Sequence, residues 1–145
     1  VFTREEDPFV IGKANTLREG GEVVIIACGP IVYEALQASD RLKERGIGAR
    51  VINMHTVKPL DEEAVLKAAF ETGAIVTAEE HQIMGGLGGA VAEVLVRHKP
   101  VPVEMVGVKD TFGESGTPEE LAEKFGLTAK NIVQAVEKVI RRKKK

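Results

Sequence analysis

The chain has 145 residues, 43% of them hydrophobic, which fits one domain with a core of its own. Its 20 Lys and Arg residues nearly balance its 22 Asp and Glu residues, and no stretch is apolar for long enough to span a membrane. The single cysteine, Cys28, excludes an internal disulfide and is typical of a reducing compartment. We therefore expect a cytoplasmic protein with neither nucleic acid nor membrane as a partner.

Three segments describe the expected organisation of the chain. Residues 1–10 resemble a linker from a preceding domain, and we expect the folded domain to span residues 11–140. Residues 141–145, RRKKK, form a basic tail. Cations at the C-terminus of a helix complement its dipole, so a solvated helix end explains this tail better than a nucleic-acid-binding arm.

The first half of the domain alternates strand-like and helix-like segments. Residues 12–19 fit either an edge strand or an approach loop, whereas the apolar, β-branched run 23–28 predicts a strand covered on both faces. Gly29 and Pro30 then begin a helix, and Gly46 is placed to end it in the left-handed conformation. A second strand is predicted over residues 49–54.

The alternation continues to the end of the chain. Asp61 is a good N-cap for a second helix, which carries Val65, Leu66, Ala69 and Phe70 and which Gly73 closes. A third strand is predicted over 74–80, and the alternation within 103–108 indicates an edge strand. Further helices are predicted after the glycine-rich turn, after the cap Thr117 with Pro118, and after Thr128. This order predicts a parallel-rich sheet with helices on both faces.

The fragment AEEHQIMGGLGGAV, residues 78–91, is the strongest candidate for a functional site. It joins Glu79, Glu80 and His81 at a strand end to a glycine-rich turn that contains Gly86. Ligands of open α/β sheets bind beyond the carboxyl ends of strands, where the winding direction reverses. The turn matches neither the P-loop nor the dinucleotide fingerprint, because it lacks Gly-Lys-Ser/Thr and the third glycine at the required spacing.

Three interpretations of this fragment remain open. The glycines can let the following helix approach the sheet closely and leave its first amides for Glu79, Glu80 or an ordered water. Alternatively, Gly29, His81 and Gly86 can bind a small anion in a crevice. A catalytic role for His81 is the third. Glu79 and Glu80 are neighbours, so on an extended strand their side chains point to opposite faces, which disfavours a cooperating acid/base pair.

No metal site is predicted, because three scattered histidines and one cysteine do not form a ligand set. The neighbours of Cys28 in VVIIACG are apolar, which favours a buried thiol over a nucleophile.

Four segments together resemble the C-terminal domain of transketolase and its thiamine-diphosphate relatives, 1-deoxyxylulose-5-phosphate synthase and the β-subunits of 2-oxo-acid dehydrogenases. They are IGKANTLREGGEVVIIACGPIVYEAL (11–36), VINMHTVKPLD (51–61), AEEHQIMGGLGGAVAEVL (78–95) and DTFGESGTPEELAEKFGLTAKNIVQAV (110–136). They cover nearly the whole chain in family order, and the last one favours the transketolase branch. The resemblance implies a three-layer α/β/α domain with a five-stranded, mostly parallel mixed sheet, in which 12–19 is an antiparallel edge strand beside 49–54.

The resemblance also implies a function for the complete enzyme. Transketolases transfer a two-carbon ketol unit from a ketose phosphate to an aldose phosphate, using thiamine diphosphate held with Mg²⁺ by preceding diphosphate- and pyrimidine-binding domains at a homodimer interface. No Gly-Asp-Gly motif for the diphosphate occurs in this chain. We therefore assign it no catalytic, cofactor-binding or metal residue, and expect it to be a non-catalytic domain that is inactive alone.

Two alternatives remain. One is a stand-alone small-anion-binding module, and the other is the equivalent docking domain of a 2-oxo-acid dehydrogenase β-subunit. In the preferred interpretation, Gly29, Glu79, Glu80, His81 and Gly86 form a crevice or an interface rather than a catalytic centre.

Overall fold

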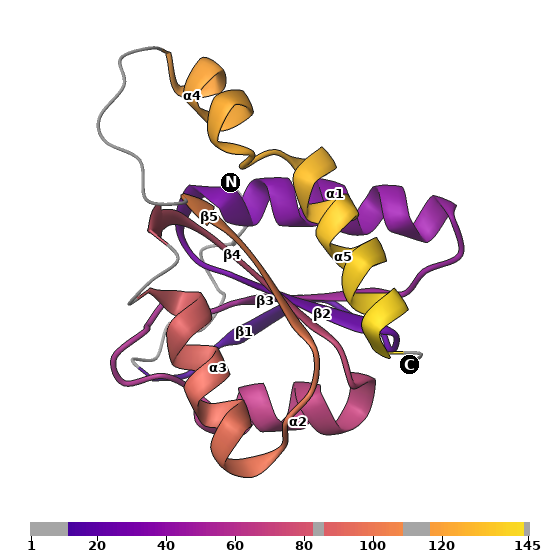
Figure 1. Ribbon diagram of the computed structural model, residues 1–145, viewed down its shortest axis with the longest axis vertical. Helices are drawn as coiled ribbons and strands as arrows, with labels where there is room; N and C mark the ends of the chain where they lie inside the picture. Colours follow the sequence, from indigo (N-terminus) through magenta and orange to yellow (C-terminus); the bar gives the residue numbers. More distant parts are fainter. Residues whose placement is uncertain (1–11, 83–85, 109–116, 144–145) are drawn as a thin grey trace.

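The computed structural model describes residues 12–82, 86–108 and 117–143. Strands and helices alternate along the chain (Figure 1), as the sequence predicts. The elements are β1 (Asn15–Arg18), β2 (Val23–Ala27), the 3₁₀ turn η1 (Gly29–Ile31), α1 (Val32–Glu44), β3 (Ala49–Asn53), α2 (Glu62–Thr72), β4 (Ile75–Gln82), α3 (Leu87–His98), β5 (Val103–Val108), α4 (Pro118–Phe125) and α5 (Ala129–Lys143).

The strands form one five-stranded mixed sheet in the order β1-β3-β2-β4-β5. β1 runs antiparallel to β3, with Asn15 opposite Asn53, whereas β3, β2, β4 and β5 run parallel to one another. The expected antiparallel edge strand beside the 49–54 strand is therefore confirmed, and of the two possibilities for 12–19 the strand is correct. β5 lies at the opposite edge, also as predicted.

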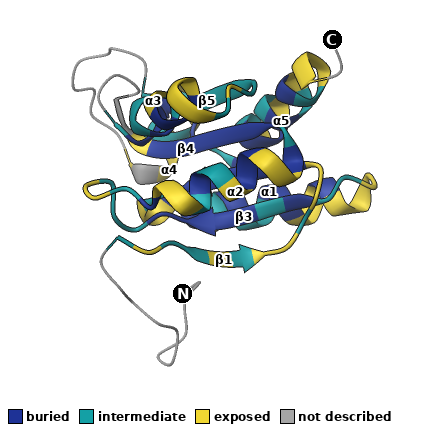
Figure 2. Ribbon diagram, turned by 90° about the horizontal axis from the view of Figure 1, so that it is seen from below, coloured by how far each residue is buried: buried dark blue, intermediate teal, exposed yellow. Residues whose placement is uncertain are grey.

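Helices cover both faces of the sheet, with α1 and α5 on one side and α2 and α3 on the other (Figure 1). All five residues of β2 are fully buried because both faces of this central strand are covered. Val23, Ile25 and Ala27 pack toward α1 and α5, while Val24 and Ile26 pack toward α2 and α3. Figure 2 shows buried residues along β3 and β4 and exposed residues on the outer surfaces of the helices.

The helix ends follow the predicted signals. Asp61 caps α2, because its Oδ1 accepts the Ala64 amide at 3.0 Å. Gly73 ends the same helix with a φ of 74°, a conformation that glycine adopts without a steric penalty. Thr117 caps α4 by accepting the Glu120 amide at 3.1 Å.

The structure differs from the sequence-based prediction in element boundaries and in the burial of one aromatic side chain. The helix expected to begin at Gly29 opens with the 3₁₀ turn η1, and β4 continues through Gln82, two residues beyond its expected end. Phe70, placed on the apolar stripe of the second helix by its spacing, is 69% exposed. Its ring lies 5.3 Å from Lys99 Nζ on the outer surface, so a cation–π contact takes the place of core packing.

The C-terminal helix continues further than expected. Arg141, Arg142 and Lys143, assigned to the basic tail 141–145, form the last turn of α5. Arg142 Nη1 contacts Glu104 at 2.6 Å and the Val103 carbonyl oxygen at 2.7 Å, so this turn is attached to β5. The rest of the tail and the expected linker 1–10 lie outside the described residues.

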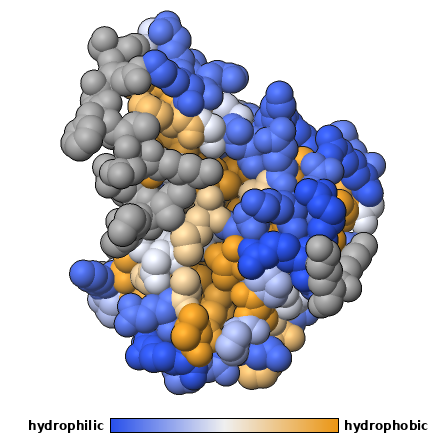
Figure 3. Space-filling view, in the orientation of Figure 1, coloured by the Kyte–Doolittle hydropathy of each residue, from blue (hydrophilic) through white to orange (hydrophobic). Residues whose placement is uncertain are grey.

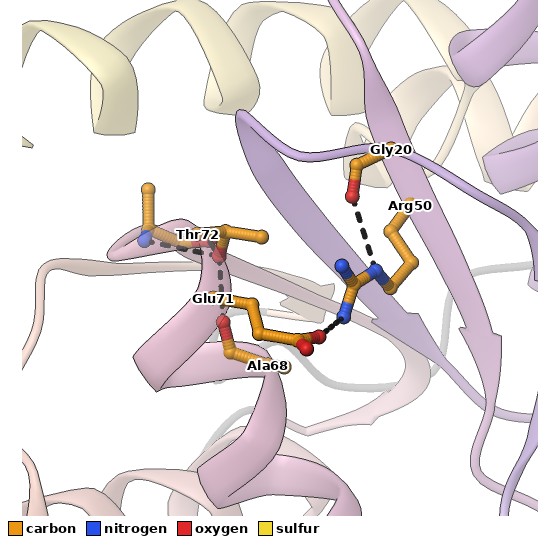
Figure 4. Close-up of polar contacts among 6 residues, drawn as sticks. Gly20, Arg50, Ala68, Glu71 and Thr72 are labelled. Atoms are coloured by element: carbon orange, nitrogen blue, oxygen red, sulfur yellow. Dashed lines mark hydrogen bonds and ion pairs between the residues drawn. The ribbon is translucent and has the colours of Figure 1, made fainter.

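Arg50 links the β1–β2 turn to α2 across the start of β3 (Figure 4). Its Nε donates to the Gly20 carbonyl oxygen at 3.0 Å, and its Nη1 contacts Glu71 Oε1 at 2.7 Å. At the end of α2, the Thr72 hydroxyl donates to the Ala68 carbonyl at 2.8 Å. Among the described residues, no helix is both long enough and apolar enough to cross a membrane.

Candidate functional site

The sheet topology brings the predicted site residues to one edge. The chain passes from β2 to β3 on one side and then to β4 on the other, so the winding direction reverses between β2 and β4. Gly29 follows β2 after the single residue Cys28, while Glu79, Glu80 and the backbone of His81 lie in the last part of β4. The Cys28 amide donates to the Ala78 carbonyl at 3.2 Å, which holds the two strand ends together.

Glu79 is the buried acid of this site, with 1% of its surface exposed. Its Oε1 accepts the Leu87 amide and its Oε2 accepts the Gly88 amide, each at 2.8 Å. These are two of the first amides of α3, which have no partner within their own helix. The negative charge also lies at the positive end of the helix dipole. Glu79 therefore caps α3 from the neighbouring strand.

Gly88 lets α3 lie close enough to the sheet for this capping. A Cβ atom at this position would lie 2.9 Å from both Thr77 Oγ1 and Met105 Sδ, closer than a real Cβ contact allows. Gly86, the N-cap residue, has extended backbone angles and offers no capping side chain. The first of the three interpretations of residues 78–91, close helix approach with amides bound by a glutamate, matches these contacts.

Glu80 differs from its neighbour because successive side chains on a strand alternate between faces. Glu80 is exposed, whereas Glu79 is buried. Glu80 lies at the edge of a mainly apolar cavity of about 360 Å³. Its other lining residues come from β5, from α4 and from the segment after α4: Val108, Leu121, Ala122, Phe125 and Leu127. The sequence did not indicate this cavity, because residues some forty positions apart form it. The two glutamates do not form a pair.

Cys28 is a thiol of low reactivity at the same edge. Its partial burial, together with the smaller effects of the negative charges of Glu79 and Glu80, raises its pKa to about 11. The thiolate is the nucleophilic form, so Cys28 is protonated and weakly nucleophilic at neutral pH. The sequence favoured a buried thiol over a nucleophile; the structure shows Cys28 partly buried, and its raised pKa disfavours a nucleophilic role.

The remaining site residues contribute backbone geometry. Gly29 has a φ of 79° and is exposed, and nothing lies within 4 Å of the position a Cβ would occupy. Its role is therefore to let the chain turn from β2 into η1. His81 belongs to β4 through its backbone, but its side chain lies outside what the structure describes. Gly85 and the whole DTFGESG segment, residues 110–116, also lie outside the described residues.

The described residues contain no group of three His, Cys, Asp or Glu side chains that could hold a metal ion. The switch point, where the winding direction reverses between β2 and β4, contains two groups of note. One is the buried Glu79 carboxylate, which accepts helix amides, and the other is the protonated Cys28 thiol. Fold and site together define a three-layer α/β domain whose switch-point acid stabilises the architecture.

Comparison with known proteins identifies the family. The model of the transketolase C-terminal domain matches residues 12–132, and the chain belongs to this family. A 6-deoxy-6-sulfo-D-fructose transketolase subunit from Clostridium sp. (strain MSTE9) is 58% identical over 139 residues, which are 96% of this chain and 43% of that protein. A 1-deoxy-D-xylulose-5-phosphate synthase from Synechococcus sp. (strain JA-2-3B'a(2-13)) is 45% identical over 131 residues, 90% of this chain and 20% of that enzyme.

A solved structure agrees with the same assignment. The chain is similar to a split gene transketolase described as an inactive β4 tetramer, with a TM-score of 0.96 and 48% sequence identity. The match covers 99% of this chain and 47% of that one. The chain thus spans less than half the length of these relatives.

Proposed function

We propose that this chain is the non-catalytic C-terminal part of an enzyme that transfers a two-carbon ketol unit between sugar phosphates. Thiamine diphosphate, with Mg²⁺, binds to preceding diphosphate- and pyrimidine-binding domains, which belong to the same subunit or to a partner subunit. The complete enzyme is a homodimer of this assembly, in the cytoplasm. The domain at residues 11–140 supports that assembly and lies beside the cleft in which the cofactor reacts.

The observation that best supports a non-catalytic role is the set of hydrogen bonds made by the Glu79 carboxylate. Both of its oxygens accept amides of α3 at 2.8 Å, and the side chain is buried. A general base must be within reach of the proton it removes, and an oxygen already held by a helix terminus in the core is not. The buried acid of the switch point thus has a structural task.

The relatives support the same division of labour. The Clostridium protein is named as a subunit of a transketolase. The matched split gene transketolase is described as an inactive tetramer of four β subunits. We infer that this chain also requires partner domains for activity. Relatives named as transketolase subunits, together with the closing sequence motif, favour the transketolase branch over a 2-oxo-acid dehydrogenase docking domain.

Calorimetry and reconstitution test this proposal. The chain alone, titrated with thiamine diphosphate in the presence of Mg²⁺, is expected to give no binding heat above that of dilution. Addition of the diphosphate- and pyrimidine-binding part of the enzyme is expected to restore both cofactor binding and ketol transfer from a ketose phosphate. Tight binding of the cofactor to the chain alone would contradict the proposal.

The alternative of a stand-alone anion-binding module is not favoured by the described contacts. It places the anion at Gly29, His81 and Gly86, next to the N-terminus of α3. The amides of Leu87 and Gly88 at that terminus are already bound by Glu79. An anion there would have to displace a buried carboxylate or bind beside its negative charge.

A further inference from the structure

A cleft on the other side of the molecule lies between α1 and α5, which pack side by side on one face of the sheet (Figure 1). It has a volume of about 170 Å³ and is lined by Arg41 and Arg45 of α1 and by Lys130, Val133, Gln134 and Glu137 of α5. Residues three or four positions apart lie on the same side of a helix, so each helix presents one row of side chains to the cleft.

Polar side chains surround an apolar floor in this cleft. Val133 is only 4% exposed and belongs to the core between the two helices and the sheet. The cationic side chains Arg41, Arg45 and Lys130 are exposed around it. Figure 3 shows that the surface over α5 and the adjoining part of α1 is largely hydrophilic, unlike the apolar surface lower in the same view.

The charges of the cleft do not cancel. Three cations face one carboxylate, and that carboxylate, Glu137 Oε2, contacts Arg45 Nη1 at 3.4 Å. Arg41 and Lys130 form no ion pair with any carboxylate among the described residues. The cleft therefore carries a surplus of about two positive charges.

Two other arginines of this chain, unlike Arg41, are paired with carboxylates and connect elements of the fold. Arg50 contacts Glu71 at 2.7 Å, and Arg142 contacts Glu104 at 2.6 Å. In each case a carboxylate neutralises the guanidinium and connects two elements. Arg41 makes no such connection, although it lies one turn from Arg45 and beside α5.

We propose that this cleft binds a phosphate group, either as inorganic phosphate or as the terminal group of a phosphate monoester. A guanidinium presents paired donors that match two phosphate oxygens, and the Lys130 ammonium adds a point charge. Gln134 contributes a neutral amide donor. The volume is that of about five or six water molecules, which suits one tetrahedral oxyanion.

The Glu137 carboxylate weakens this binding. It occupies Arg45 in the absence of a ligand and repels an incoming anion. The cations are exposed, so water and salt screen them, and the dissociation constant is on the order of millimolar. This site is distinct from the switch point, since neither Gly29 nor Glu79 lines it.

An NMR titration of the ¹⁵N-labelled full chain tests the proposal. Sodium phosphate is compared with sodium chloride at equal ionic strength, and glycerol 3-phosphate serves as a monoester probe. We expect saturable shifts of the amides near Arg41 and of residues 130–137 with phosphate and not with chloride. If glycerol 3-phosphate binds more tightly, the preferred ligand is a phosphate monoester. If inorganic phosphate binds more tightly, the preferred ligand is the free phosphate ion.

Matched variants separate the cleft from general charge effects. Arg41→Gln and Lys130→Gln are each expected to weaken phosphate binding about fivefold, whereas Glu137→Gln strengthens it. Lys43→Gln removes the same charge from α1 outside the cleft and is expected to leave the dissociation constant unchanged. Shifts that never saturate, that chloride reproduces, or that centre on Gly86 overturn the proposal. An equal loss in Lys43→Gln and Arg41→Gln does so as well.

Discussion

At the scale of single residues, two adjacent glutamates with the same side chain differ in burial and in hydrogen bonding. Glu79 is buried and accepts two amides of α3, whereas Glu80 is exposed at the edge of a cavity. Strand alternation alone separates them, and it placed them on opposite faces in the sequence-based prediction. Which one faces the helix depends on the register between β4 and its neighbours.

Glu79→Gln is expected to lower the free energy of unfolding by about 1–3 kcal/mol. The amide side chain can accept only one of the two bonds and carries no charge to complement the helix dipole. Chemical denaturation measures the change. Glu80→Gln, at the neighbouring exposed position, is the control and is expected to change stability by less than about 0.5 kcal/mol. Equal effects of the two substitutions would contradict the capping role.

Cys28 is expected to react slowly with an alkylating reagent at pH 7. Its pKa is raised to about 11, so the thiolate is about one part in ten thousand at that pH, and the rate rises about tenfold per pH unit up to pH 10. Stopped-assay alkylation followed by mass spectrometry gives the profile.

Glu80→Gln is expected to speed the reaction of Cys28, because removal of a nearby negative charge lowers the pKa of the thiol. Glu44→Gln, on the exposed end of α1, is the control and leaves the rate unchanged. A rate that levels off near pH 8 would show that the thiol has an ordinary pKa.

At the scale of elements, close approaches of backbone to backbone decide which glycines are required. Gly20 and Gly21 are neighbours in the β1–β2 turn, and the sequence does not distinguish them. A Cβ at Gly20 would lie 2.6 Å from backbone atoms of Ala49 and Arg50, whereas nothing lies within 4 Å of a Cβ at Gly21. Backbone atoms cannot rotate away as a flexible side chain can.

Gly20→Ala is therefore expected to cost about 1–3 kcal/mol of stability, because the turn must move away from β3 and Arg50 loses its bond to the Gly20 carbonyl. Gly21→Ala is the matched control and is expected to be neutral within about 0.5 kcal/mol. Thermal denaturation of both variants is the measurement. Equal melting temperatures for the two would refute the close approach.

Asp61 connects the start of α2 to the segment before β1, which is distant in sequence. Its Oδ1 caps α2, as predicted, and its Oδ2 accepts the amide of Ala14 at 2.8 Å. The capping bond is local and can be recognised from sequence. The second bond crosses 47 positions, and the local pattern around either residue gives no sign of it.

At the scale of the whole molecule, stability is expected to decrease from the middle of the sheet outward. Every residue of β2 is fully buried between two helical layers, whereas none of the described side chains of α4 is buried. Segments with few buried contacts open locally at a lower free energy than the core.

Hydrogen exchange followed by NMR is expected to show this gradient. Amides of β2 and β4 should exchange only when the chain unfolds globally, while amides of α4 exchange by local opening and much faster. The amides of α5, which Arg142 attaches to β5, are expected to fall between these limits. Equal protection of α4 and β2 would show that α4 is part of the same cooperative unit.

The sequence by itself determined the order of elements, the helix caps Asp61 and Thr117, and the doubly covered strand at 23–28. These depend on periodicity and on contacts within a few positions, so the local sequence encodes them. The family followed from the order of four motifs, and its relatives confirmed it.

Only the tertiary structure decided which acid is buried, which glycine is required, and which cations meet. Glu79 reaches α3 across eight and nine positions, Gly20 lies against β3, and Arg41 and Lys130 line one cleft between helices far apart in the chain. Such contacts depend on the register of the sheet and on how closely the helices pack against it. The physical reason is that side-chain burial and charge pairing are set in space, where residues distant in sequence become neighbours.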